Sequence, residues 1–246
     1  MTFKLLSTGN PKTLKGEAQG YMTYILHLAP ADLSGHEVCP KRTQGCTASC
    51  LNTAGRGGMF RRGEYTNIIQ QARIRKTKWF FDDRQSFLEQ LVVDIAGAIK
   101  QAGKKGFIPV FRLNGTSDLS WEKYTIIGGK NIFELFPDVQ FYDYTKVLGR
   151  KVTHIENYHL TFSRAENNDA DVVKAVHAGM NVAAVYDQLP EGMFSADDSD
   201  LRFLDPKVGV IGLKAKGRAK KDYSGFVIRI KEVDSIGKTM YNAINN

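Results

Sequence analysis

The stretch from Leu88 to Phe111, LEQLVVDIAGAIKQAGKKGFIPVF, holds the change of pattern that indicates the fold class. Five apolar residues recur in its first half at the spacing of one helix face: Leu88, Leu91, Val92, Ile95 and Ile99. Gly103 follows and predicts the end of that helix, and the apolar run from Phe107 to Phe111 then predicts a buried strand. A helix that leads into a strand is the repeating unit of an α/β protein.

Five more apolar runs predict strands, at residues 24–28, 139–142, 158–162, 181–186 and 208–213. A second helix is predicted just before residue 88, with its basic residues outward and four residues facing the core: Tyr65, Ile68, Ile69 and Ala72. A third helix is predicted from Ala170 to Ala178. Strands that alternate with helices imply parallel pairing through right-handed crossovers. We therefore expect a single α/β domain over residues 1–246, built as an open sheet or as a barrel.

The composition is that of a globular chain. The 246 residues are 42% hydrophobic and 24% charged, which excludes an intrinsically disordered or fibrous protein. No apolar run approaches the roughly 20 residues that cross a bilayer, and the apolar part of residues 1–9 is too short for a secretory signal. We therefore expect a cytoplasmic protein without a membrane partner, and the sequence does not indicate its oligomeric state.

Positive charge is concentrated in parts of the chain. The net charge of +8 gathers in residues 56–78 and 214–221, whereas acidic residues gather between 187 and 205. This distribution suits a polyanion, so six residues are predicted to contact nucleic acid: Arg61, Arg62, Arg73, Arg75, Lys76 and Lys78. The alternative is an ordinary solvated face. The aromatic run from Trp79 to Phe81 predicts either a stacking surface or a core anchor.

All the cysteines lie in one glycine-rich segment, CPKRTQGCTASCLNTAGRGG at residues 39–58. An odd number of clustered thiols in a cytoplasmic chain indicates a metal centre rather than a disulfide, with three ligands: Cys39, Cys46 and Cys50. The centre is either zinc, with His36 as a fourth ligand, or an iron–sulfur cluster with one open iron. We favour the cluster, in a loop at residues 36–58, because this loop follows the first predicted strand and is rich in basic residues.

Polar residues follow the predicted strands where the apolar runs end. The carboxyl ends of parallel strands meet at one edge of a sheet or one mouth of a barrel, so these side chains would converge there. We predict seven of them as contacts for a cofactor or substrate: Arg112, Asn114, Asp118, Asp143, Lys146, Arg164 and Lys214. Ordinary loop polarity is the alternative for any one of them.

Four segments resemble the bacteriophage gene-product-eighty-eight domain family: NPKTLKG at 10–16, the loop at 39–58, FRLNGTSD at 111–118 and VGVIGLKAKG at 208–217. More remotely, the layout is similar to radical S-adenosylmethionine (SAM) enzymes. That resemblance implies a partial (βα)6 barrel, a [4Fe–4S] cluster on the three cysteines and SAM on the open iron. It also implies that Asn114 and Asp118 receive the ammonium group of SAM and that Arg112 pairs with a carboxylate.

Together these inferences predict a radical SAM-like iron–sulfur enzyme that acts on nucleic acid or a nucleotide in the cytoplasm of an infected bacterial cell. The alternative is a non-catalytic nucleic-acid-binding protein in which an iron–sulfur cluster or zinc only braces the loop. SAM binding distinguishes the two, because the enzyme requires it and the binding protein does not. The sequence indicates neither the substrate nor the catalytic residues.

Overall fold

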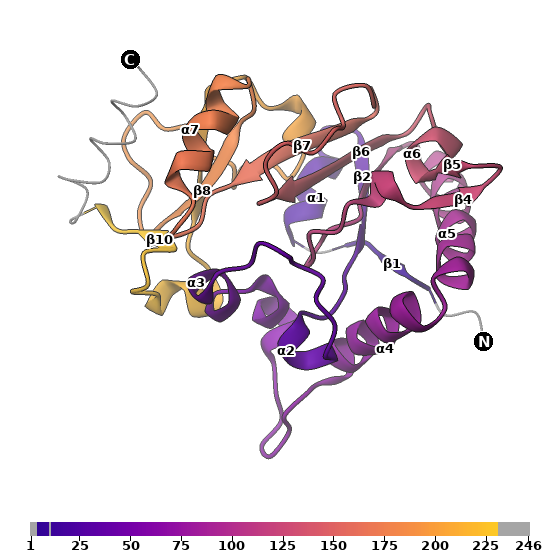
Figure 1. Cartoon of the computed structure of the whole chain (residues 1–246), viewed down its shortest axis with the longest axis horizontal. Helices are drawn as coiled ribbons and strands as arrows, with labels where there is room; N and C mark the ends of the chain where they lie inside the picture. The colour runs from indigo at the N-terminus through magenta and orange to yellow at the C-terminus, as the bar shows by residue number, and fades with distance from the viewer. Residues whose placement is uncertain (1–3, 10, 231–246) are drawn as a thin grey trace.

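The computed structural model describes residues 4–9 and 11–230, which fold around one mostly parallel β-sheet (Figure 1). Six parallel strands lie side by side in chain order: β2 (Tyr21–Leu26), β3 (Ile108–Arg112), β6 (Gln140–Thr145), β7 (Tyr158–Ser163), β8 (Val182–Tyr186) and β9 (Val210–Lys214). They overlap the six strands predicted from the sequence. The single α/β domain and the parallel pairing are thereby confirmed.

The two ends of the sheet differ. β1 (Leu6–Ser7) pairs with β2 in the antiparallel direction. At the other end, the first two residues of β8 pair with the end of β7, its last two pair with β10 (Val227–Ile228), and β9 pairs along its whole length. β10 therefore continues the line of β7, and the segment just before β10 lies at the carboxyl edge of the sheet.

Helices cover one face of this sheet: α4 (Ile68–Asp82), α5 (Arg84–Lys104), α6 (Ile132–Leu135) and α7 (Asp169–His177). α5 contains the predicted helix of residues 88–103. Its N-cap residue is Asp83, whose carboxylate accepts the N–H of Ser86. Its buried stripe packs in one core with alternate residues of the strands, such as Tyr24 and Phe111.

The opposite face of the sheet is covered by the segment between β8 and β9, which includes η4 (Arg202–Leu204). Leu201 packs there with Val110 and Tyr142, the residues that alternate with the helix-facing ones. Asp200 forms an ion pair with Arg112 across 3.1 Å. Both faces of the parallel strands are therefore buried, as their near-continuous apolar sequence requires.

The remaining elements are short: α1 (Pro11–Glu17), α2 (Ala31–Ser34), α3 (Gln44–Ala48), η1 (Leu51–Thr53), η2 (Gly55–Gly58), η3 (Trp121–Lys123), η5 (Gly217–Lys221), and a separate hairpin of β4 (Thr125–Ile127) and β5 (Lys130–Asn131). Within the described part of the chain, no helix has the length and apolar character needed to cross a membrane.

The orientation predicted for the helix before residue 88 is wrong. α4 begins only at Ile68, and the side chains of Tyr65 and Ile68 are 95% and 77% exposed. Its inward face carries polar residues that bond to backbone instead. Thr77 Oγ1 accepts the N–H of Ala29 at 2.8 Å, and the buried Lys76 donates to the carbonyl of Leu5 at 2.5 Å. An apolar pattern cannot reveal a face that is buried through hydrogen bonds.

Candidate functional site

The cysteine segment docks on the carboxyl edge of the sheet through Glu166, which follows β7. One carboxylate oxygen of Glu166 accepts the N–H of Gly45 at 2.7 Å, and the other accepts the hydroxyl of Thr43 at 2.7 Å. Gly45 leaves no room for a side chain, because a Cβ there would lie 2.0 Å from Ser224 Oγ. Residues 43–45 are thus pressed between the end of β7 and the segment before β10, beside the buried Phe226.

The three thiols lie within electrostatic reach of one another. Burial, together with the smaller effects of the charges of Cys50, Asp118 and Cys46, raises the pKa of Cys39 to about 12. Burial also raises the pKa of Cys50, and Cys46 adds to the effect. Lys146 opposes the rise of the pKa at both Cys39 and Cys50. All three are free thiols, and thiolates are soft metal donors.

The thiols are not arranged around a single ion. Three sulfurs that bind one tetrahedral zinc at about 2.3 Å lie roughly 3.8 Å apart. Among the residues that the structure describes, no three His, Cys, Asp or Glu side chains form a group that could hold a metal ion. The ring of His36 stacks instead on that of Phe81, with their centres 4.4 Å apart. A cluster in which each thiolate binds a different iron does not require the sulfurs to touch a common ion.

Two cations face the thiols. Lys146, directly after β6, donates its ammonium group to Ser163 Oγ at 3.2 Å. Arg73 on α4 donates to the side-chain oxygen of Asn52 at 2.8 Å and to its carbonyl at 3.1 Å, and its charge lowers the pKa of Cys50. The positive charges of Lys146 and Arg73 would therefore favour a negatively charged group on the thiols.

Asp118 lies next to Cys39. Its N–H donates to the carbonyl of Val38 at 2.7 Å, and its Oδ2 accepts the N–H of Lys146 at 2.7 Å. Its buried Oδ1 has no hydrogen-bond partner and lies 3.7 Å from Arg150 Nη1. The carboxylate does not cap the turn at Trp121, because η3 has Ser120 at its N-cap and no side-chain bond there.

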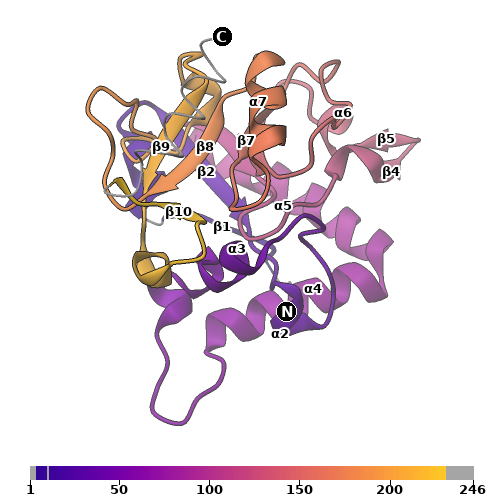
Figure 2. The same ribbon diagram turned by 60° about the vertical axis from the view of Figure 1, so that its left-hand side comes forward.

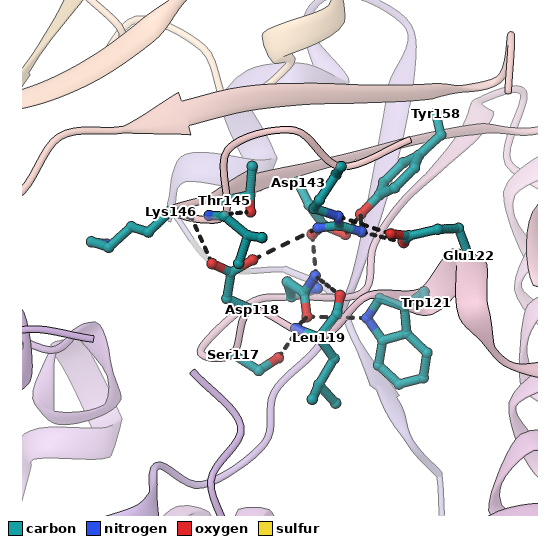
Figure 3. A network of polar contacts seen from close by, with 12 residues as sticks. Ser117, Asp118, Leu119, Trp121, Glu122, Asp143, Thr145, Lys146 and Tyr158 are labelled. Atoms are coloured by element: carbon teal, nitrogen blue, oxygen red, sulfur yellow. Dashed lines mark hydrogen bonds and ion pairs between the residues drawn. The ribbon is translucent and has the colours of Figure 1, made fainter. Parts of the chain in front are cut away.

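Ser117, Asp118, Leu119 and Trp121 lie close together in one loop (Figure 3). Asn114 organises this loop through its side chain. Its side-chain oxygen accepts three hydrogen bonds, from Ser117 Oγ at 2.9 Å, the N–H of Leu119 at 2.9 Å and Trp121 Nε1 at 3.0 Å. Its amide nitrogen donates to the carbonyl of Leu119 at 2.9 Å. The side chain is therefore occupied within its own loop and leaves no lone pair for a ligand.

Asp143 and Tyr158 of the sheet lie beside this loop (Figure 3). Asp143 and Arg150 fasten the loop to the sheet. Asp143 on β6 accepts the N–H of Asn114 at 2.8 Å and the hydroxyl of Tyr158 at 3.2 Å. Arg150 pairs with both carboxylate oxygens of Glu122, at 3.1 and 2.5 Å, and donates to the hydroxyl of Tyr158 at 3.2 Å. Sequence reasoning missed Arg150 and Glu122, because neither follows a strand or belongs to a motif.

The other residues predicted at the strand ends lie apart from this group. Arg112 points to the face of the sheet that Asp200 covers. Arg164 pairs with Asp169 at 3.1 Å and donates to the carbonyls of Gly225 and Phe226, which holds β10 in place. Lys214 lines a separate cavity of about 540 Å³ together with two acids and three other residues: Asp187, Gln188, Leu189, Ser195 and Asp198. The structure thus brings Asp118 and Lys146 to the cysteines.

The basic residues predicted to bind nucleic acid are divided between surface and interior. Arg61, Arg62, Arg75 and Lys78 are exposed, whereas Arg73 is bonded to Asn52. Lys76 is buried, and burial lowers its pKa to about 8, so the expectation that it faces outward is wrong. The aromatic run at 79–81 belongs to the core, with its middle ring, Phe80, fully buried.

Asp143 gives a prediction for stability against pH. Burial raises its pKa to about 7, although Arg112 and the N–H of Asn114 oppose the rise. The unfolded chain releases this proton near pH 4, whereas the folded chain keeps it up to about pH 7. As the pH rises from 4 to 7, the free energy of unfolding therefore falls by up to about 1.4 kcal/mol for each pH unit. We expect Asp143→Asn to remove that loss, as measured by urea unfolding at several pH values. Asp138→Asn, at an exposed turn, is the control, and parallel curves for wild type and Asp143→Asn would contradict the prediction.

The fold and the site together define an α/β protein with a cysteine-rich loop docked at the carboxyl edge of a parallel sheet. A family model described as Gene product 88 matches residues 4–230. The chain therefore belongs to the gene product 88 family, and its resemblance to this phage family is confirmed. No curated protein and no solved structure matches it. The similarity to radical SAM enzymes stays a prediction.

Proposed function

We propose that this protein is an iron–sulfur enzyme of the radical SAM type, which acts on nucleic acid or a nucleotide in the infected cell. The observation that carries the proposal is the meeting of the three thiols with Lys146 and Asp118 at the carboxyl ends of parallel strands. The six strands follow one another in chain order, as in a β/α barrel. This order supports a partial (βα)6 barrel as the scaffold.

The donor set fits a [4Fe–4S] cluster. Cys39, Cys46 and Cys50 supply one soft thiolate for each of three irons, which leaves the fourth iron open to another ligand. The nearby charges of Lys146 and Arg73 would offset the negative charge of the thiolates, whose formation burial otherwise opposes. Zinc has less support, because the proposed fourth ligand, His36, stacks on an aromatic ring.

The Oδ1 of Asp118 has an ion pair with Arg150 at 3.7 Å but no hydrogen bond, and this supports a ligand with an ammonium group at the open iron. A buried carboxylate oxygen without a donor is costly, and a ligand ammonium would supply a charge-assisted hydrogen bond. SAM carries such a group. We assign Asn114 to the shape of the loop rather than to the ligand, because its side-chain oxygen already accepts three hydrogen bonds.

When bound, the cluster would supply the electron for cleavage of the sulfonium of SAM, and thereby the radical that removes hydrogen from a substrate. The chain's own residues would do the rest. Asp118 would hold the ammonium group of SAM, the amine of Lys146 would present a positive charge, and the docked cysteine loop would exclude water.

A nucleic-acid-binding protein with a bracing metal is the second candidate. Arg61 and Arg62 favour it, because they are exposed on the segment that leads from the cysteines to α4. Protein purified without oxygen and analysed for iron, sulfide and zinc tests the cluster. Titration of the reduced protein with SAM, followed by paramagnetic resonance and by assay of 5′-deoxyadenosine, tests the enzyme. Stoichiometric zinc without iron would refute the cluster. An iron–sulfur protein indifferent to SAM would favour the second candidate.

Asp118→Asn tests the ligand contact separately from the cluster. The amide keeps the size of the carboxylate but loses its charge, so we expect SAM to bind roughly 10- to 150-fold more weakly, with iron content unchanged. Asp138→Asn, at an exposed turn, serves as the matched control. Equal SAM affinity in Asp118→Asn and wild type would show that Asp118 does not hold the ligand.

A further inference from the structure

The segment between η2 and α4, residues 59–66, extends away from the body of the protein in both views (Figures 1 and 2). We call it the projecting loop. Its base is fixed by Asn67, whose amide nitrogen donates to the carbonyls of Arg56, Gly57 and Met59 at 3.1, 3.0 and 2.9 Å. Gln70 adds a bond to the carbonyl of Gly57 at 2.9 Å. The base is therefore anchored to α4.

Large apolar side chains lie uncovered on and beside the projecting loop. The exposed fractions are 95% for Tyr65, 77% for Ile68, 68% for Met59, 53% for Leu51 and 37% for Phe60. Seven other large apolar side chains are exposed in the described part of the chain, and they are scattered along the rest of it. A concentration of exposed apolar surface in one segment indicates a binding surface.

The charge of the projecting loop indicates which class of partner it binds. Arg61 and Arg62 are exposed at its tip, and Arg56 is exposed at its base. The acidic residue of the loop, Glu64, is engaged within it, since its Oε2 accepts the N–H of Arg61 at 3.1 Å. Arg61 and Arg62 outnumber the one acid of the loop, and aromatic rings beside such a positive charge match a chain of bases and phosphates, in which rings stack and guanidinium groups bind phosphate.

We infer that the projecting loop docks single-stranded nucleic acid, with Phe60 and Tyr65 stacking on bases and Arg61 and Arg62 contacting phosphates. A single strand is favoured over a duplex, because rings on a narrow loop reach bases only where these are unstacked. The inference rests on the nucleic-acid substrate of the proposed function and not on its cluster. In the chain, the projecting loop follows Cys50 through η1 and η2.

Fluorescence anisotropy with a labelled single strand of about 15 nucleotides, and with its duplex, tests the inference. We expect Tyr65→Ala to lower the affinity for the single strand roughly 5- to 150-fold. Tyr223→Ala, which removes another highly exposed tyrosine, is the matched control. Charge reversal at Arg61 and Arg62 together should lower both the affinity and its salt dependence. The same double reversal at two exposed lysines should change them less: Lys104 and Lys105.

Three outcomes would overturn the inference. In the first, the wild type does not bind the oligonucleotide. In the second, the wild type binds strand and duplex equally and Tyr65→Ala has no effect. In the third, sedimentation shows self-association that Tyr65→Ala abolishes, while oligonucleotide binding stays unchanged. Iron content and SAM cleavage are measured on the same variants. Their survival in Tyr65→Ala, together with lost oligonucleotide binding, supports the inference. If the purified protein contains no iron–sulfur cluster, we still expect the wild type to bind the oligonucleotide.

Discussion

We expect replacement of Cys39, Cys46 or Cys50 by Ser to reduce the iron and sulfide of anaerobically purified protein to background and to remove the brown colour of an iron–sulfur cluster. Each substitution leaves two thiolates for the cluster, and the chain contains no other cysteine to replace the lost one. A hydroxyl of similar size keeps the packing around the sulfur, so the far-ultraviolet circular dichroism should stay that of the wild type. Metal and sulfide analysis of the three variants measures the effect.

Ser49→Ala is the matched control for these cysteine variants, because it lies next to Cys50 and keeps all three thiols. It should retain the iron and sulfide of the wild type. Retention of iron by any one of the three cysteine variants would show that this cysteine is not a ligand. Loss of iron in Ser49→Ala as well would show that the loop, rather than the thiols, decides metal content.

The strands and α5 could be predicted from the sequence because their burial is apolar and periodic. The apolar residues from Leu88 to Ile99 lie on one side of α5, and each buried strand is a short continuous run of apolar residues. Alternation of helices and strands then implied parallel pairing. Pairing in chain order is a property of the assembled sheet, and the pattern of the sequence left an open sheet and a barrel equally possible.

The candidate site could be predicted only in part. The cysteines were found from their clustering, and Asp118 and Lys146 from their places after strands. Glu166 docks the cysteine loop, but in the sequence it is one loop acid among many. It could not be predicted, because the residues it binds are 121 and 123 positions away. Contacts over such distances depend on the fold and leave no local signal.

Arg150 is the clearest case of a residue that only the fold reveals, and its loss has the second large effect that we expect. Its side chain is 3% exposed and binds Asp118 and Glu122 from the loop after β3 and Tyr158 from β7. Arg150→Met fills much of the same volume but leaves the buried carboxylate of Glu122 without its cation. Breaking a buried ion pair in this way costs about 3–5 kcal/mol of the free energy of unfolding.

Urea unfolding at pH 7 measures the effect of Arg150→Met, and Lys151→Met, at the exposed next position, is its control. If the unpaired carboxylate is the cause, adding Glu122→Leu to Arg150→Met should recover much of the loss, because the uncompensated charge is then gone. A loss below about 1 kcal/mol in Arg150→Met would place the pair among weak surface interactions. The double variant would still lack the Arg150 contact to Asp118. We therefore expect both Arg150→Met and the double variant to bind SAM more weakly than the wild type, although the double variant recovers stability. That separation would distinguish the positioning of Asp118 from the stability of the loop that carries it.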